Sequence, residues 1–213
     1  NVTVDNNVVI FSYGALELKE VPNTLTIIGA GATGLELGSV FARMGSRVTI
    51  VEKLNHICGP EADEYIAGLL QKELEQQGIS FLLDCKVKAV DTHENSATVH
   101  VVDPSGTAHM WPTEKVLVAV GRRPATFGLG LAEAGVEMDK EGCVVINDQG
   151  RTNIPSIWAA GDCAQSYHLV SRKPIHAALG TVANKQGRVA GMNLGGHYAT
   201  FPGVVGTAIT KFM

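Results

Sequence analysis

Three glycines have the residue type and spacing that bind a dinucleotide. Gly29, Gly31 and Gly34 stand in the stretch IIGAGATGLE, where an apolar run gives way to a helical pattern. At this G-x-G-x-x-G spacing the first glycine permits a tight turn, the second lets the backbone approach a pyrophosphate, and the third allows close helix–strand packing. The helix start adds unpaired N–H groups and partial positive charge, which favour phosphate. The alternative is a purely structural turn.

Glu52 lies at the end of the next apolar segment, at the distance downstream expected of an acid that binds a ribose. A carboxylate accepts hydrogen bonds from the adenosine ribose and repels a 2′-phosphate, so it favours NAD(H) over NADP(H). Arg47 and Lys53 are close in the sequence and weaken that preference, although such cationic side chains are mostly solvated. The sequence therefore predicts an NAD(H) site.

A parallel α/β scaffold must position these residues, and the hydrophobic pattern predicts one. Residues 24–28 and 47–53 have the β-branched, apolar composition of buried parallel strands. Between them, apolar residues recur at helical spacing from Thr33, and Gly45 stands where a helix ends. The expected buried face of this helix comprises Leu37, Val40, Phe41 and Met44.

A second helix is expected to start at Pro60 and to run to Gly78. Proline suits the first helical position, and the acids that follow it (Glu61, Asp63 and Glu64) complement the helix dipole. Strand, helix, strand and helix in this order indicate a parallel sheet with right-handed crossovers. The expected buried face of this helix comprises Ile66, Leu69, Leu70 and Leu74.

Shorter segments of alternating polarity follow, which indicate an antiparallel meander that covers or extends the sheet. They are residues 79–84, 86–91 and 96–102. Residues 115–120 return to a buried strand, and the composition changes after Pro124. Further strands are expected at 143–148 and 156–162, a helix at 175–194 and a strand from 201.

The composition excludes several function classes. A net charge of −4 gives no electrostatic footprint for nucleic acid or an anionic membrane. No apolar run has the roughly 18–20 residues that cross a bilayer, and no signal peptide is evident. The cysteines lack metal-site or redox-motif spacing, and no histidine has the context of a catalytic group. We therefore expect a cytoplasmic protein without a metal site and without catalytic residues in this chain.

Two further motifs make the glycine loop specific. VAVGRRP at 118–124 and TNIPSIWAAGD at 152–162 follow it in order. With them, nearly the whole chain resembles the flavin-dependent pyridine nucleotide–disulfide oxidoreductases. Most of the chain is similar to dihydrolipoamide dehydrogenase. The segment from Gly161 onward is more similar to the coenzyme A-disulfide reductase and NADH oxidase branch. The resemblance implies two Rossmann-like domains that bind NAD(H) and FAD, and hydride transfer between them.

The resemblance also implies roles for single residues. Glu36 would face the nicotinamide–flavin junction, the alternative being an ordinary helix carboxylate. Asp162 would bind the FAD ribityl chain, the alternative being a strand-end cap. The remaining implied cofactor contacts are the pyrophosphate loop (Gly29, Ala30, Gly31, Ala32, Thr33 and Gly34), Glu52 at the adenosine ribose, Val87 beside the adenine and Gly121 beside the nicotinamide ribose.

Parts of the family pattern have no counterpart in the sequence. A second G-x-G-x-x-G, the redox cysteine motif and the dimerisation domain are not found. We therefore expect an excised portion of a homodimeric parent enzyme, and by itself this portion would retain FAD weakly and lack turnover. The acceptor stays open between a disulfide or thiol and an oxygen-type acceptor. The alternative function is a stand-alone NAD(H)-sensing Rossmann module.

The resemblance implies a domain organisation as well. We expect an α/β protein with a Rossmann-like parallel sheet, an antiparallel meander and part of a second α/β domain. Residues 23–125 would form the NAD(H)-binding domain. The flanking parts would be a linker at 1–22, the later part of the FAD-binding domain at 126–200 and the start of a truncated dimerisation domain at 201–213.

Overall fold

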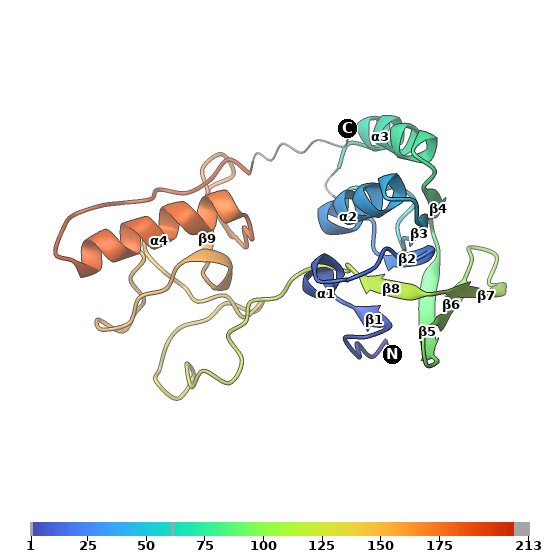
Figure 1. The fold of residues 1–213 in the computed structure, drawn as a ribbon. Coiled ribbons are helices and arrows are strands. Elements are labelled where there is room, and N and C mark those ends of the chain that lie inside the picture. The colour runs from blue at the N-terminus through green and yellow to red at the C-terminus, as the bar shows by residue number, and fades with distance from the viewer. Residues whose placement is uncertain (1, 61, 207–213) are drawn as a thin grey trace. The chain divides into compact units, whose positions relative to one another are not determined.

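The computed structural model describes residues 2–60 and 62–206 and divides the chain into two compact units. The first unit ends at Gly121 and the second begins at Arg122. Figure 1 shows that the first unit contains the larger sheet and the second the long helix α4. Glu61, which was predicted to lie at a helix start, and the part of the predicted C-terminal strand beyond residue 206 lie outside the described residues.

The first unit is built on a five-stranded parallel sheet with strand order β1-β8-β2-β3-β4. Apart from Arg47 and Lys115 at their starts, its central strands consist of β-branched and apolar residues, as expected for strands that are buried on both faces. The short helix α1 (Ser12–Leu16) follows β1. The strands are β1 (Val9–Ile10), β2 (Thr24–Ile28), β3 (Arg47–Val51), β4 (Ser80–Leu82) and β8 (Lys115–Val118).

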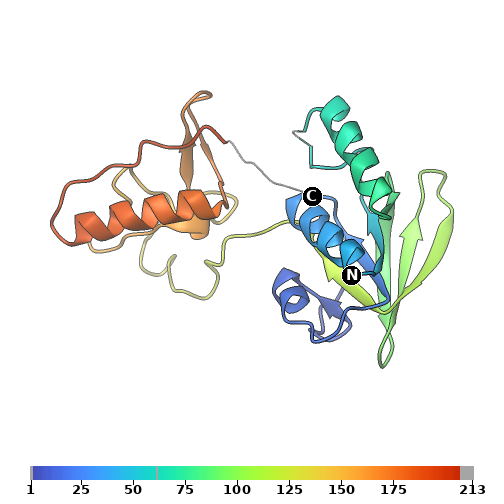
Figure 2. The ribbon, with the colours of Figure 1, turned by 45° about the horizontal axis from the view of Figure 1, so that its top comes forward.

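Helices cover one face of this sheet and a meander covers the other (Figure 2). The alternation along each strand separates the two cores. Ile27 and Ile50 pack with the helices, whereas Ile28 and Val51 pack with the meander. The predicted α/β class, with a parallel sheet and an antiparallel meander, is confirmed.

Helix α2 (Ala32–Arg43) lies close to the sheet because its buried face includes the small residues Gly34, Gly38 and Ser39. A Cβ at Gly38 would stand only 3.1 Å from the Ile50 side chain. The predicted face was wrong in part: Phe41 is buried and Leu37 partly so, but Val40 and Met44 are exposed. Sequence periodicity identifies a buried face from its bulky apolar residues, whereas the close contact between α2 and the sheet requires glycine and serine.

Helix α3 runs over Glu64–Gln76, so its predicted start at Pro60 was wrong. The Asp63 carboxylate accepts a hydrogen bond from the Ile66 N–H at 3.1 Å and caps the helix at that point. The predicted face was also wrong in part: Leu74 is fully buried and Leu70 packs against the core, but Ile66 and Leu69 are exposed.

The segment at 79–84 does not belong to the meander. Its central part, β4, pairs in parallel with β3, and the register joins Ile50 to Phe81. The chain then turns at Asp84, whose φ is 54°. The prediction was wrong because alternation cannot distinguish a half-buried edge strand from a meander strand. The meander comprises β5 (Lys86–Thr92), β6 (Ala97–Val102) and β7 (Ala108–Thr113), and sequence analysis missed β7.

The second unit has little regular sheet. Helix α4 (Gly180–Leu194) confirms the predicted helix with a later start, and β9 (Ser166–His168) pairs with β10 (Lys173–Ile175) as a hairpin. The predicted strands at 143–148 and 156–162 were wrong. Within the described residues, these segments form only isolated bridges such as Val144–Ala164, and residues 161–163 form the 3-10 helix η1.

We predict that acid weakens the β6–β7 turn through Asp103. Its carboxylate accepts hydrogen bonds from Ser105, Thr107 and His109, and the Ser105 hydroxyl contributes most to holding its pKa far below the ordinary 3.8. The unfolded carboxylate takes up a proton near the ordinary value, so the stabilisation is complete above it and is lost as the pH falls towards the folded pKa.

Denaturant unfolding at a series of acidic pH values tests this prediction. Asp103→Asn should show a smaller loss of unfolding free energy than the unchanged chain on acidification below about pH 4. Glu94→Gln, in the preceding turn, serves as the control and should follow the unchanged chain. Identical pH profiles for all three proteins would contradict the prediction.

Candidate dinucleotide-binding site

A tight turn connects β2 to α2 at the carboxyl end of the parallel sheet. Gly29 has φ +107°, and an added Cβ would lie 2.6 Å from the Ala119 carbonyl oxygen, beyond the end of β8. Its N–H donates to the Val51 carbonyl oxygen at 2.8 Å, which joins the turn to the end of β3. Only glycine fits both the dihedral angle and the space at this position.

The other two glycines of the motif occupy contrasting environments. An added Cβ at Gly34 would clash with the Gly29 carbonyl oxygen, so the first turn of α2 lies directly against the loop. At Gly31, an added Cβ would meet no described heavy atom within 4 Å. Gly34 therefore permits close packing, while the open side of Gly31 leaves room for a ligand to approach the backbone.

The start of α2 has the electrostatics of an anion-binding site. Gly31 is the N-cap residue and provides no side chain to accept from the helix N–H groups, and the first turn contains no acidic residue. The first amides of an α-helix, here from Ala32 onward, have no carbonyl partner within the helix. Partial positive charge is thus directed into the open space at Gly31.

Glu52 holds this loop from the adjacent strand end. Its side chain is buried, Oε2 accepts from the Ala30 N–H at 2.7 Å, and Oε1 accepts from the Leu54 N–H at 3.0 Å. Sequence analysis missed this loop-holding role, because nothing in the pattern indicates which backbone N–H groups the acid meets. Each carboxylate oxygen has two lone-pair positions, so both can accept a further hydrogen bond.

Further predicted residues of the first unit lie on several elements. Glu36 is exposed on α2, Val87 is half-buried on β5, and Gly121 follows β8 with φ +125°. The Cys85 N–H donates to the Glu52 carbonyl oxygen at 2.9 Å, which places the start of β5 beside the end of β3. The Cys58 side chain is exposed, and its N–H donates to the Ala30 carbonyl oxygen at 2.9 Å, a contact with the loop that sequence analysis did not predict.

In the second unit, Asp162 lies in η1 and forms an ion pair with Arg122. The Arg122 Nη2 lies 3.0 Å from Asp162 Oδ2, and the Asp162 side chain is about one-third exposed. Asp162 lies in η1 and not at the end of a strand, and one oxygen of its carboxylate faces a guanidinium. The other carboxylate oxygen, Asp162 Oδ1, takes no part in this ion pair.

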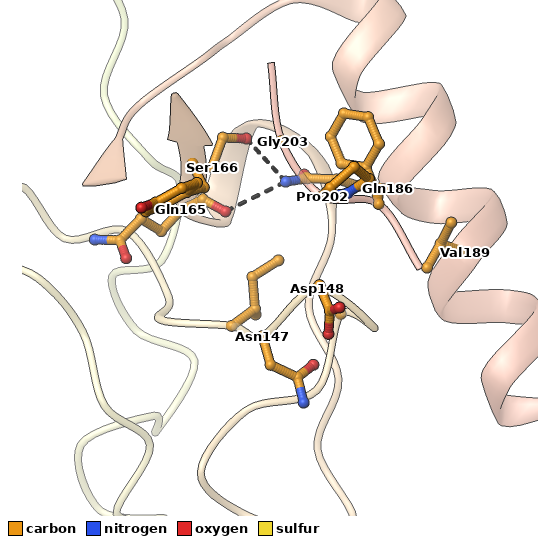
Figure 3. Close-up of a pocket in the computed structure, with 12 residues that line it drawn as sticks. Asn147, Asp148, Gln165, Ser166, Gln186, Val189, Pro202 and Gly203 are labelled. Atoms are coloured by element: carbon orange, nitrogen blue, oxygen red, sulfur yellow. Dashed lines mark hydrogen bonds between the residues drawn. The ribbon is translucent and has the colours of Figure 1, made fainter. Parts of the chain in front are cut away.

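Gln186 on α4 fixes the segments on both sides of Asp162, a role that sequence analysis missed. The side chain is buried: Oε1 accepts from the Gly161 N–H at 2.8 Å, and Nε2 donates to the Ser166 hydroxyl and the Gln165 carbonyl oxygen at 2.9 and 3.2 Å. Figure 3 shows the two Nε2 bonds at the edge of a cavity of about 260 Å³. Asp148 is the acidic residue of its lining.

Other kinds of site are not found in the part of the chain that the structure describes. No group of three or more acidic, histidine or cysteine side chains could hold a metal ion there. No helix within residues 2–60 and 62–206 is long and apolar enough to cross a membrane.

Comparison with known proteins decides the family. Residues 3–187 match the pyridine nucleotide-disulphide oxidoreductase family. The chain belongs to this family. A curated family relative, dihydrolipoyl dehydrogenase 3 of Pseudomonas putida, is 40% identical over 97% of this chain. The chain covers 43% of that relative, which is less than half of its length.

Solved structures of the pyridine nucleotide-disulphide oxidoreductase fold also match. The NAD-dependent persulfide reductase from A. fulgidus aligns with a TM-score of 0.83 and 31% identity, over 93% of this chain and 36% of that one. The FAD-dependent pyridine nucleotide-disulphide oxidoreductase from Desulfovibrio vulgaris aligns with a TM-score of 0.81 and 29% identity, over 95% and 50%. The family resemblance inferred from the three motifs is thus confirmed.

We predict that alanine destabilises the chain at one glycine of the loop and has little effect on stability at another. Gly34→Ala should lower the free energy of unfolding by about 1–3 kcal/mol, because the new methyl group collides with the Gly29 carbonyl. Gly31→Ala should change it by less than about 1 kcal/mol, since the methyl group enters open space. Urea unfolding of both variants measures the difference. Equal destabilisation would contradict the packing described for Gly34.

Proposed function

We propose that this chain is the NAD(H)-binding portion of an FAD-dependent pyridine nucleotide–disulfide oxidoreductase. The parent enzyme would pass hydride between NADH and FAD, and electrons on to a disulfide, a thiol or an oxygen-type acceptor. The observation that carries the proposal is the open helix start at Gly31, which the buried Glu52 carboxylate holds through the Ala30 N–H. Family membership and the NAD- and FAD-dependent relatives support it.

The loop residues would bind the pyrophosphate through the backbone. Gly31 has no Cβ to keep a phosphate away, and the amides of Ala32 and Thr33 begin the helix beside it. A phosphate at a helix start gains roughly 0.3–1 kcal/mol from the dipole alone, before its hydrogen bonds are counted. Gly29, Ala30 and Gly34 shape the loop by allowing the turn and the close packing.

Glu52 would determine which nicotinamide cofactor binds. Its position is fixed by two backbone N–H groups, so it would meet the ribose already oriented. Its remaining lone pairs would accept from ribose hydroxyls, and a 2′-phosphate at the same place would be repelled. The arrangement therefore favours NAD(H) over NADP(H).

The remaining assignments extend the proposal to the rest of both cofactors. Val87 would line the adenine side, Gly121 would lie beside the nicotinamide ribose, and Glu36 would face the reacting ends of the cofactors. In the second unit, Asp162 Oδ1 would accept from the FAD ribityl chain while Arg122 fixes Oδ2. When both cofactors are bound, the nicotinamide and the flavin supply hydride transfer, and the protein positions them.

Calorimetric titration of the chain with NADH and with NADPH tests the cofactor preference. We expect measurable binding of NADH and at least tenfold weaker binding of NADPH, because a charge-assisted bond to Glu52 contributes roughly 1.5–3 kcal/mol. Gly31→Ala should weaken NADH binding without loss of folding. Comparable affinities for the two nucleotides would contradict the role of Glu52, and no binding of either would contradict the NAD(H) site in this chain.

A substitution of nearly the same shape that removes the carboxylate charge tests the role of Glu52. Glu52→Gln should lose NADH affinity by roughly tenfold to a hundredfold and reduce the discrimination against NADPH, since the amide nitrogen cannot accept from a ribose hydroxyl or a backbone N–H. The exposed Glu73→Gln on α3 makes the same chemical change away from the loop and should bind like the unchanged chain. Unchanged selectivity in Glu52→Gln would contradict the proposal.

A further inference from the structure

The fold brings together two cysteines that the sequence separates. Val144 and Ala164 form a parallel β-bridge in the second unit. The Val144 N–H donates to the Cys163 carbonyl oxygen, and the Gln165 N–H donates to the Val144 carbonyl oxygen, each at 2.9 Å. Cys143 and Cys163 immediately precede the two bridged residues, so they are neighbours across the pair of segments.

The spacing of neighbouring strands suits a covalent link. Paired strands lie about 4.8 Å apart, and disulfides join residues whose Cα atoms are roughly 4.4–6.8 Å apart. The isolated bridge at Val144–Ala164 thus puts each cysteine one residue from a position with this spacing, and the Cys163 thiol is near enough to Cys143 to raise the pKa of its thiol.

The two thiols differ in their access to solvent. Cys143 is fully buried, and burial raises the pKa of its thiol to about 11, with further contributions from the nearby Asp139, Glu141 and Cys163. Cys163 is half-buried, and its Sγ donates to the Ala160 carbonyl oxygen at 3.4 Å. Cys163 is thus the thiol that an oxidant in solution reaches, and Cys143 is the protected neighbour.

We propose that Cys143 and Cys163 form a disulfide-forming pair that peroxide oxidises. The Cys163 thiolate attacks one oxygen of hydrogen peroxide, the O–O bond breaks, the departing hydroxide leaves as water after protonation, and Cys163 becomes a sulfenic acid. The Cys143 sulfur then attacks the Cys163 sulfur, the S–S bond forms, and the S–O bond breaks with release of a second water. Two thiols lose two electrons, and one peroxide is reduced to two waters.

The site is distinct from the dinucleotide loop and next to Asp162. Cys163 directly follows Asp162 in η1, so the disulfide would tie this turn to the segment that contains Cys143. The other thiols provide internal comparisons within the first unit: Cys58 is exposed, and Cys85 is buried. The proposal does not depend on the cofactor assignments.

Peptide mapping of the chain after peroxide treatment tests the proposal. Trypsin cleaves after Lys140, Arg151 and Arg172, so Cys143 and Cys163 fall in separate peptides, 141–151 and 152–172. The folded chain, treated with hydrogen peroxide and then alkylated under denaturing conditions, should lose two of its four free thiols. The two peptides should appear as one disulfide-linked species that a reductant separates.

Two controls make the result decisive. The same oxidation in concentrated urea should distribute the link among the possible cysteine pairs, because the fold no longer selects one. A Cys58→Ser, Cys85→Ser variant should form the link as the unchanged chain does, and Cys163→Ser should retain a free Cys143. If the 141–151 and 152–172 link is no more abundant in the folded chain than in urea, or if Cys163 is over-oxidised without linking, the proposal is overturned.

Discussion

The buried carboxylate of Glu52 is the interaction on which the candidate site depends. A carboxylate taken out of water needs hydrogen bonds in exchange, and here two backbone N–H groups provide them. One belongs to the glycine loop and the other follows β3, so one side chain fixes two loops at the carboxyl edge of the sheet. That edge is where ligands bind in open α/β sheets. The group that would select the cofactor therefore also maintains the loop that would bind it.

Close packing between α2 and the sheet brings the helix start to this edge. Gly34 and Gly38 remove side chains where the helix meets the Gly29 carbonyl, Ile27 and Ile50. Alternation along the same strands sends Ile28 and Val51 to the opposite face, where the meander covers them. The sheet is thus buried on both sides, which explains why its central strands have continuous apolar sequences. A bulkier helix face would move the first amides of α2 away from the loop.

In the second unit, polar side-chain contacts hold the turn that contains Asp162 more than sheet hydrogen bonds do. Gln186 satisfies Gly161, Gln165 and Ser166 from α4, and Arg122 pairs with Asp162. Buried amide networks of this kind fix geometry because each unpaired member would be costly. The family match spans both units, and the dihydrolipoyl dehydrogenase and persulfide reductase relatives are more than twice as long as this chain. The names of these two relatives give different activities, so family membership alone does not identify the electron acceptor of the parent enzyme.

The sequence by itself determined the family, the α/β class and the glycine–acid pattern, because spacing along the chain carries these signals. It also indicated β2, β3, β8 and α4, whose patterns are strong and local. Only the tertiary structure decided which face of α2 is buried, that β4 joins the parallel sheet, and where α3 begins. The buried face of α2 depends on its close approach to the sheet, and the place of β4 depends on its pairing with β3; both involve residues distant in sequence. The start of α3 depends on a single hydrogen bond, the one to the Asp63 cap. For the same reason, the Glu52–Ala30 bond, the Gln186 contacts and the adjacency of Cys143 and Cys163 could not be read from the sequence: each joins groups that only folding brings together.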